Sequence, residues 1–240
     1  EYKALGKRQL KRDFISASYK GDEDKVRELL ELGISPNLST GDLKGITFKR
    51  NMESVPAIAF PVILGHGAVT KLLFEKGVDL PKVKNNPNRG QVNVDKSNVL
   101  YHYIRSDYTT RADVKDSKGA FVLQNKDREK LLSKLRKEWD EGLNALIQAG
   151  ADLNQKYYDF DVRRRANSTP LMMALDRNHL NAAKMLITSG SDVNAKDKQG
   201  VSALMIVKGI ARQYRGREAD VTYINQLDEI IKLLESAGAK

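Results

Sequence analysis

The sequence contains no cysteine, so it can form neither disulfide bonds nor cysteine-ligated zinc sites. It also lacks an apolar run near the roughly 18 residues that a membrane-spanning helix needs. The most apolar stretch, 55–64, is shorter and contains Pro56 and Pro61. Aromatic residues make up only 7%, whereas 40% hydrophobic and 30% charged residues are typical of a folded chain. We therefore expect a folded chain with no transmembrane segment.

Recognisable catalytic motifs are also missing. No serine lies in a nucleophile-elbow pattern, and no glycine-rich loop followed by Lys-Ser or Lys-Thr could hold a phosphate. The three histidines, His66, His102 and His179, are widely separated. His66 and His179 precede expected helices and need only a structural role, whereas His102 is a packed, solvated or ligand-contacting residue. We therefore expect no enzyme activity, no metal and no cofactor.

The chain is strongly basic, with a net charge of +10 and a pI of about 9.6. This balance favours an acidic partner, which can be an acidic protein surface, a nucleic acid or an anionic membrane surface. Alternatively, the cations only solvate a long surface.

One short pattern recurs along the chain: an apolar pair, a few polar or small residues, glycine, and then Asp or Asn near an apolar residue. Glycine directly after a helical stretch adopts the left-handed conformation of a C-terminal cap, and Asp and Asn favour the turn that follows. The five copies are centred on Gly33, Gly77, Gly150, Gly190 and Gly238.

Two helices are expected before each of these glycines. In the clearest copy, Ser168 or Thr169 can cap the first helix, and Pro170 suits its first turn, where no amide donor is required. The second helix carries an apolar stripe that includes Leu180 and Leu186. Pro61 would lie several residues into the first helix of the second copy, so that helix is short or begins later than the pattern suggests.

These residues resemble the ankyrin repeat family, most closely in segment 167–199. There Thr169 to Leu171 open the first helix, Ala174 lies in its packed face, and Gly190 ends the second helix. Met172 replaces the histidine of the family's motif, so one hydrogen bond typical of the family is missing. The resemblance implies an all-α fold, an ankyrin-repeat solenoid of stacked helix-turn-helix units with β-hairpin or loop fingers. It implies one monomeric domain over 1–240, with units at about 10–40, 54–85, 97–156, 167–199 and 200–240.

The units are longer than the family's repeat of about 33 residues. The recurring glycines are 44, 73, 40 and 48 residues apart. Two insertions are expected between the paired helices, at about 108–127 and 208–223. The first precedes an unusually long second helix whose extra turns carry Leu131, Leu132 and Leu135, which residues 121–123 of the insertion could cover. These insertions either cover the core or form interaction surfaces.

The remaining insertions are the fingers, which in this family usually line the concave binding face together with the first helices. They are expected at 38–53, 81–96, 155–166 and 195–200, with net charges of +1, +3, +2 and +1. Together these segments hold +7 of the net +10. Because tyrosine and arginine often dominate interfaces, we predict a partner-binding surface in the first three. Its candidate residues are Lys49, Arg50, Lys82, Lys84, Arg89, Tyr157, Tyr158, Arg163, Arg164 and Arg165.

Three functions follow as hypotheses. The first is a protein-binding module that recognises an acidic protein surface on the basic concave and finger face. The second is nucleic-acid or polyanion binding through the same basic strip, which would weaken steeply with salt. The third is an exported or host-delivered bacterial effector or envelope adaptor, because insertion-rich arrays of this kind resemble those of bacteria.

The compartment stays open at this stage. The chain begins at Glu1 and has no cysteine, which fits a soluble, exported protein whose signal peptide has been removed. A cytoplasmic location fits equally.

Overall fold

A computed structural model describes residues 6–43, 55–80, 99–106, 125–157, 167–215 and 221–240. The chain divides into two compact units, 1–150 and 151–240. The described residues are mainly helical and contain no β-strand beyond isolated bridges. The fold class is therefore all-α, as the sequence predicts.

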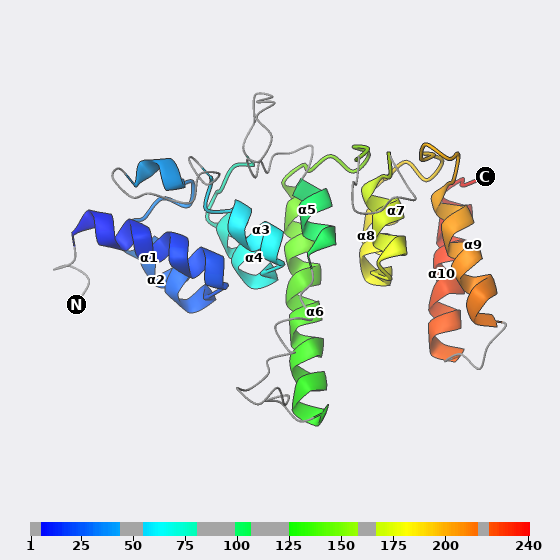
Figure 1. The fold of residues 1–240 in the computed structure, drawn as a ribbon, viewed down its shortest axis with the longest axis horizontal. Coiled ribbons are helices and arrows are strands. Elements are labelled where there is room, and N and C mark those ends of the chain that lie inside the picture. The colour runs from blue at the N-terminus through cyan, green and yellow to red at the C-terminus, as the bar shows by residue number, and fades with distance from the viewer. Residues whose placement is uncertain (1–5, 44–54, 81–98, 107–124, 158–166, 216–220) are drawn as a thin grey trace. The chain divides into compact units, whose positions relative to one another are not determined.

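The described residues of the first unit form three pairs of helices (Figure 1). The first helix of each pair packs on the first helix of the neighbouring pair, and the second helices do the same. A 3-10 turn, Thr40–Asp42, follows the first pair. The pairs are α1 (Lys7–Lys20) with α2 (Glu23–Glu31), α3 (Ala59–Leu64) with α4 (Gly67–Glu75), and α5 (Val99–Arg105) with α6 (Asn125–Gln148).

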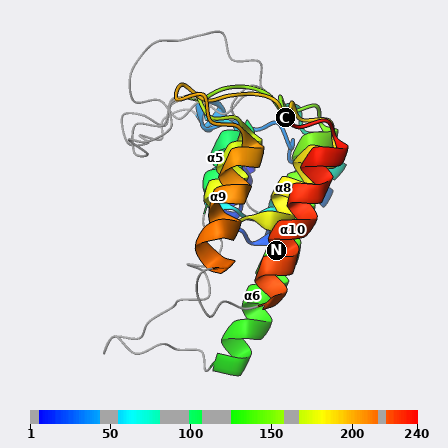
Figure 2. The same ribbon diagram turned by 90° about the vertical axis from the view of Figure 1, so that its right-hand side faces the viewer.

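In the second unit, two pairs lie within the described ranges, and Figure 2 looks onto the last of them. Here α7 packs on α9, and α8 packs on α10, so the pairs stack in parallel. The bounds are Pro170–Asp176 for α7, Leu180–Thr188 for α8, Ala203–Arg215 for α9 and Val221–Ser236 for α10.

The five recurring glycines end the second helix of each pair, as predicted. Their φ angles are all positive, between 79° and 91°, a conformation that strains residues carrying a Cβ atom. The predicted start of α7 is also confirmed, because Thr169 caps the helix by accepting a hydrogen bond from the Met172 amide, with Pro170 in the first turn.

An asparagine after three of these glycines ties successive turns together. The side-chain oxygen of Asn37 accepts the Asp79 amide at 2.9 Å, and that of Asn154 accepts the Asp192 amide at 2.7 Å. Asn194 accepts the Lys240 amide at 3.0 Å. After Gly77 the corresponding place in the sequence is taken by Pro81, which has no polar side-chain atom for such a bond.

Pro61 is accommodated because α3 begins late and is short. The helix runs from Ala59 to Leu64, so Pro61 lies in its first turn, where amides have no partner within the helix. The Ala57 carbonyl, four residues back, instead accepts the Phe60 amide at 3.3 Å. The missing donor of the proline therefore leaves no vacant bond.

The closest helix contact in the first unit joins α4 to α6 through two glycines. A Cβ atom on Gly67 would overlap the backbone carbonyl of Glu138, and one on Gly142 would lie 2.8 Å from the Cα atom of Gly67 and overlap the Tyr103 hydroxyl. No larger residue fits at either position without moving a helix.

An aromatic cluster packs against this contact. The rings of Tyr103 and Trp139 are stacked with centroids 5.0 Å apart, and the Tyr103 hydroxyl donates to the Trp139 carbonyl at 2.9 Å. The Trp139 indole donates to the Ser106 hydroxyl at 3.1 Å. Burial, followed by the charges of Asp140 and Glu138, raises the pKa of Tyr103 well above its ordinary value of 10.0. Tyr103 is therefore a neutral core residue that joins α5 to α6.

Helix α6 is as long as predicted, and its first turns project beyond α4 and α5 (Figure 1). Leu135 is buried, whereas Leu131 and Leu132 are half-buried and no residue of 126–134 is buried. Residues 121–123, which we expected to cover them, lie outside the described residues.

The structure corrects the expectation that 208–223 is an insertion between two helices. Residues 208–215 continue α9, and 221–223 begin α10, so most of this segment lengthens the two helices. The ion pairs Lys208–Glu235 and Arg215–Asp228 join the added turns of α9 to α10. Most of the other insertion, 108–124, lies outside the described residues.

The glycine contact predicts a steric effect on stability. Gly142→Ala should destabilise the first unit by about 1–3 kcal/mol, because the added methyl group forces α4, α6 and Tyr103 apart. Gly209→Ala in α9 is the control, since a Cβ atom there meets nothing within 4 Å. It should be neutral or stabilise by up to about 1 kcal/mol.

Urea denaturation followed by circular dichroism and by the fluorescence of Trp139, the chain's single tryptophan, measures both effects. Equal midpoints for Gly142→Ala and the natural sequence would contradict the close packing.

Candidate partner-binding surface

Tyr157 alone among the predicted binding residues lies within the described part of the chain. It is half-buried, and its backbone pairs with Ser168 in an antiparallel bridge. The others, Lys49, Arg50, Lys82, Lys84, Arg89, Tyr158, Arg163, Arg164 and Arg165, lie outside the described residues. Their positions as a binding surface stay a prediction.

The bases of three expected fingers are fixed by backbone hydrogen bonds. At the first, the Thr40 amide bonds to the Val55 carbonyl at 2.9 Å, and the Ala57 amide bonds to the Leu38 carbonyl at 2.8 Å. At the third, the Tyr157 amide bonds to the Ser168 carbonyl at 3.0 Å. Each of these segments therefore leaves and re-enters its unit at adjacent points.

The fourth finger, 195–200, is fully described and is a tight loop organised by Asp197. The Asp197 carboxylate is buried and accepts the amides of Gln199 at 2.9 Å and Val201 at 2.8 Å. Gly200 completes the turn with a φ of 80°. A bridge between Lys196 and Ser202 closes the loop just before α9.

Lysines gather at the bases of the two fingers in the second unit. Lys156, Lys196 and Lys198 are exposed, and the Lys156 ammonium donates to the Lys196 backbone carbonyl at 2.9 Å. This bond ties one base to the next. Because Asp197 turns inward to cap its own loop, the exposed side chains at these bases are mainly cationic.

The histidines take the structural roles expected for two of them. His66 and His179 occupy the N-cap positions of α4 and α8. The Nε2 atom of His66 lies 3.0 Å from the Tyr19 carbonyl, which links the second pair of helices to the first. His102 lies on α5, half-exposed, with its ring 5.2 Å from that of Tyr101.

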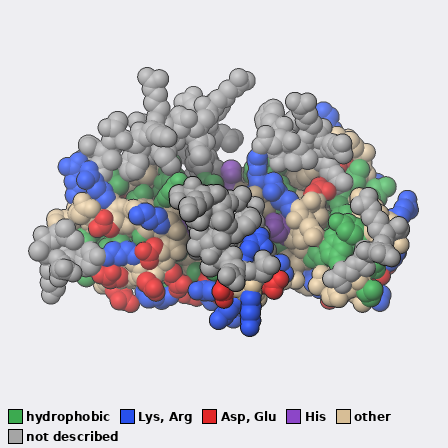
Figure 3. Space-filling model, turned by 60° about the horizontal axis from the view of Figure 1, so that its bottom comes forward, with side chains coloured by type: hydrophobic (Ala, Val, Ile, Leu, Met, Phe, Trp, Pro, Cys, Tyr) green, Lys and Arg blue, Asp and Glu red, His purple; other side chains and the backbone are tan. Residues whose placement is uncertain are grey.

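Apolar side chains are exposed on the last pair of helices. Met205 is 59% exposed on α9 and Val221 is 69% exposed on α10. The Tyr214 ring meets the Tyr223 ring edge-on at 4.9 Å, and the Tyr223 hydroxyl donates to Asn178. Figure 3 shows hydrophobic side chains on this part of the surface, while Lys and Arg gather at the projecting end of α6.

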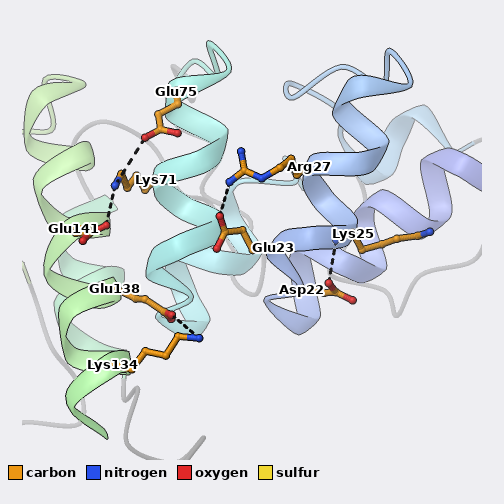
Figure 4. Close-up of polar contacts among 9 residues, drawn as sticks. All are labelled: Asp22, Glu23, Lys25, Arg27, Lys71, Glu75, Lys134, Glu138 and Glu141. Atoms are coloured by element: carbon orange, nitrogen blue, oxygen red, sulfur yellow. Dashed lines mark hydrogen bonds and ion pairs between the residues drawn. The ribbon is translucent and has the colours of Figure 1, made fainter. Parts of the chain in front are cut away.

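A groove of about 910 Å³, which the sequence pattern does not predict, lies between α4 and α6 in the first unit. Lys71 crosses one end of it, 2.8 Å from Glu141 and 4.0 Å from Glu75 (Figure 4). The hydrogen bond and charge of Glu141 raise the pKa of Lys71, and the same bond lowers the pKa of Glu141. Pro81 stands where an asparagine recurs in three other copies, which is a signal in the sequence that this junction differs.

Comparison with known families agrees with this geometry. Residues 167–198 match the family model of the ankyrin repeat. The chain contains an ankyrin repeat. The match covers α7, α8 and the turns on either side, which is the segment that carries the resemblance most closely in the sequence. A search of curated proteins found no match to the chain.

Ankyrin repeats are protein-interaction modules in general. In this repeat, Thr169 caps the first helix, and backbone bridges join Tyr157 to Ser168 and Lys196 to Ser202 on either side. No helix in the described ranges is long and apolar enough to cross a membrane.

The Asp197 loop yields a prediction about the base of the fourth finger. Asp197→Ala removes the acceptor of two backbone amides and should cost about 1–3 kcal/mol in local stability. Hydrogen exchange at Gln199 and Val201 should accelerate, whereas amides in α8 keep their rates. Asp192→Ala is a matched control, because that exposed side chain accepts only the Asn194 amide in its own turn. Unchanged exchange at Gln199 and Val201 would contradict the capping role.

Proposed function

We propose that this chain is a non-catalytic protein-binding module whose partner docks an acidic surface onto the finger face. We define the finger face as the four segments 38–53, 81–96, 155–166 and 195–200. The observation that carries the proposal is their charge, +7 of the net +10, in a protein that carries an ankyrin repeat. Most of the chain's excess charge thus belongs to the segments that depart from the repeat.

The described bases of these segments support the proposal. The bridges Ser39–Pro56, Tyr157–Ser168 and Lys196–Ser202 fix where three of the segments begin and end. In the second unit, the exposed lysines at the two bases extend the positive charge of the segments onto the described surface. Fixed attachment limits the conformational entropy that the segments lose when a partner binds.

In the proposed mechanism, charge sets the rate and orientation of encounter, and a few Tyr and Arg side chains supply most of the affinity. Tyr157, Tyr158 and the run Arg163 to Arg165 combine both residue types within one segment. Guanidinium groups form paired hydrogen bonds with carboxylates, so Asp and Glu on the partner are the groups they would recognise. The chain acts in this account as a monomer.

The proposal predicts that reversing the charge of the third segment abolishes binding. The triple variant Arg163→Glu, Arg164→Glu and Arg165→Glu should recover at least about tenfold less partner in a pull-down from the native cells. A control with the same charge change, Lys126→Glu, Lys130→Glu and Lys137→Glu, alters exposed residues of α6. It should recover normal amounts of partner.

Equal recovery by the natural chain and the arginine triple variant would contradict the finger face as the binding site. A gel-shift titration with double-stranded DNA at two salt concentrations tests the polyanion alternative. Under the protein-binding proposal no shift occurs at low salt. A shift that weakens steeply with salt and is lost in the arginine variant would favour nucleic acid instead.

A further inference from the structure

The groove between α4 and α6, which we call the α4–α6 groove, follows from how these helices cross. Gly67 begins α4 and touches α6 beside Gly142, so the helices are closest at that end of α4. The groove is lined farther along by Phe74 and Glu75 at the other end of α4 and by Asn144 to Ala149 of α6. Because α4 and α6 touch near the start of α4, they diverge toward its end and leave the groove there.

The floor of the groove is apolar. Val78 and Leu80, in the turn after α4, are only 7% and 4% exposed, and Phe74 and Ala145 are half-buried beside them. A volume of about 910 Å³ is within the range of clefts that bind ligands, roughly 300–1,000 Å³. The groove therefore has room for several side chains above an apolar floor.

The rim of the groove is acidic, in a chain whose net charge is strongly positive. Glu75, Asp79 and Glu141 line it, and Lys71, the one cation among the described lining residues, is already engaged by Glu141 and Glu75. The C-terminal ends of α4 and α6 also border the groove, and helix C-termini carry partial negative charge. Electrostatics at this site therefore favours a cationic occupant.

The turn after α4 also lacks the asparagine that ties successive turns elsewhere. Asn37, Asn154 and Asn194 each bond to the backbone of the following turn, whereas the corresponding residue of this copy is Pro81.

We propose that the α4–α6 groove binds a basic segment of a partner protein. A Lys or Arg of that segment lies against Glu75 and Asp79, and a neighbouring apolar side chain packs on Phe74 and Leu80. This surface selects the charge opposite to that selected by the finger face, so the two can engage different partners or different parts of one partner.

Selection of random dodecapeptides displayed on phage, with the immobilised full-length chain as target, tests the proposal. The natural chain should enrich peptides that combine Lys or Arg with apolar residues. The double variant Glu75→Lys with Asp79→Lys should lose this enrichment, and a selected synthetic peptide should bind it at least about tenfold more weakly. The control Glu31→Lys with Glu129→Lys makes the same charge change at exposed positions outside the groove and should keep the enrichment.

A second variant distinguishes a blocked groove from an unfolded chain. Asn144→Arg places a cation of the chain's own in the groove, at an exposed position of α6 where arginine favours the helix. It should keep the native fluorescence of Trp139 and still lose the peptide. Failure to enrich basic peptides, or equal binding by the two groove variants and the natural chain, would overturn the proposal. Neither result would bear on the finger face, whose arginine variant is tested separately.

Discussion

The contact between Gly67 and Gly142 is the constraint on which the first unit depends. Because neither residue has a side chain, α4 and α6 approach until backbone meets backbone, and Tyr103 and Trp139 pack around the junction. This contact anchors the C-terminal half of a helix of 24 residues and leaves its N-terminal turns projecting. It also sets the divergence of the two helices, and with it the α4–α6 groove.

Residues that follow the repeat pattern and residues that depart from it serve different purposes. Glycines in the left-handed conformation, the Thr169 cap and the N-cap histidines end and begin helices, and the asparagines join the turns. The departures instead create surfaces. Positive charge accumulates in the finger segments, which depart from the repeat, whereas the lining of the α4–α6 groove is acidic and partly apolar. We infer that partner choice resides in these departures.

The sequence predicts local structure well where one residue decides it. Gly190 predicts the end of a helix because few residues other than glycine adopt a positive φ there. Pro170 predicts the start of a helix because the first helical turn needs no amide donor at its position. The sequence predicts less where the outcome depends on packing between distant segments. The groove requires knowing that Gly67 meets Gly142, 75 positions later in the chain, and the segment 208–215 is helical because its ion pairs and contacts with α10 extend α9. Of the candidate surface, the charge pattern could be read from the sequence, but the groove could not.

Hydrogen exchange along α6 tests the central claim, that the glycine contact holds this helix in place. We predict slow exchange from Leu135 to Gln148, where Leu135, Trp139, Leu143 and Leu146 are buried. Amides of residues 126–134 should exchange much faster, because none of those residues is buried. Uniform protection along the whole helix, or slower exchange in 126–134 than around Gly142, would contradict the account.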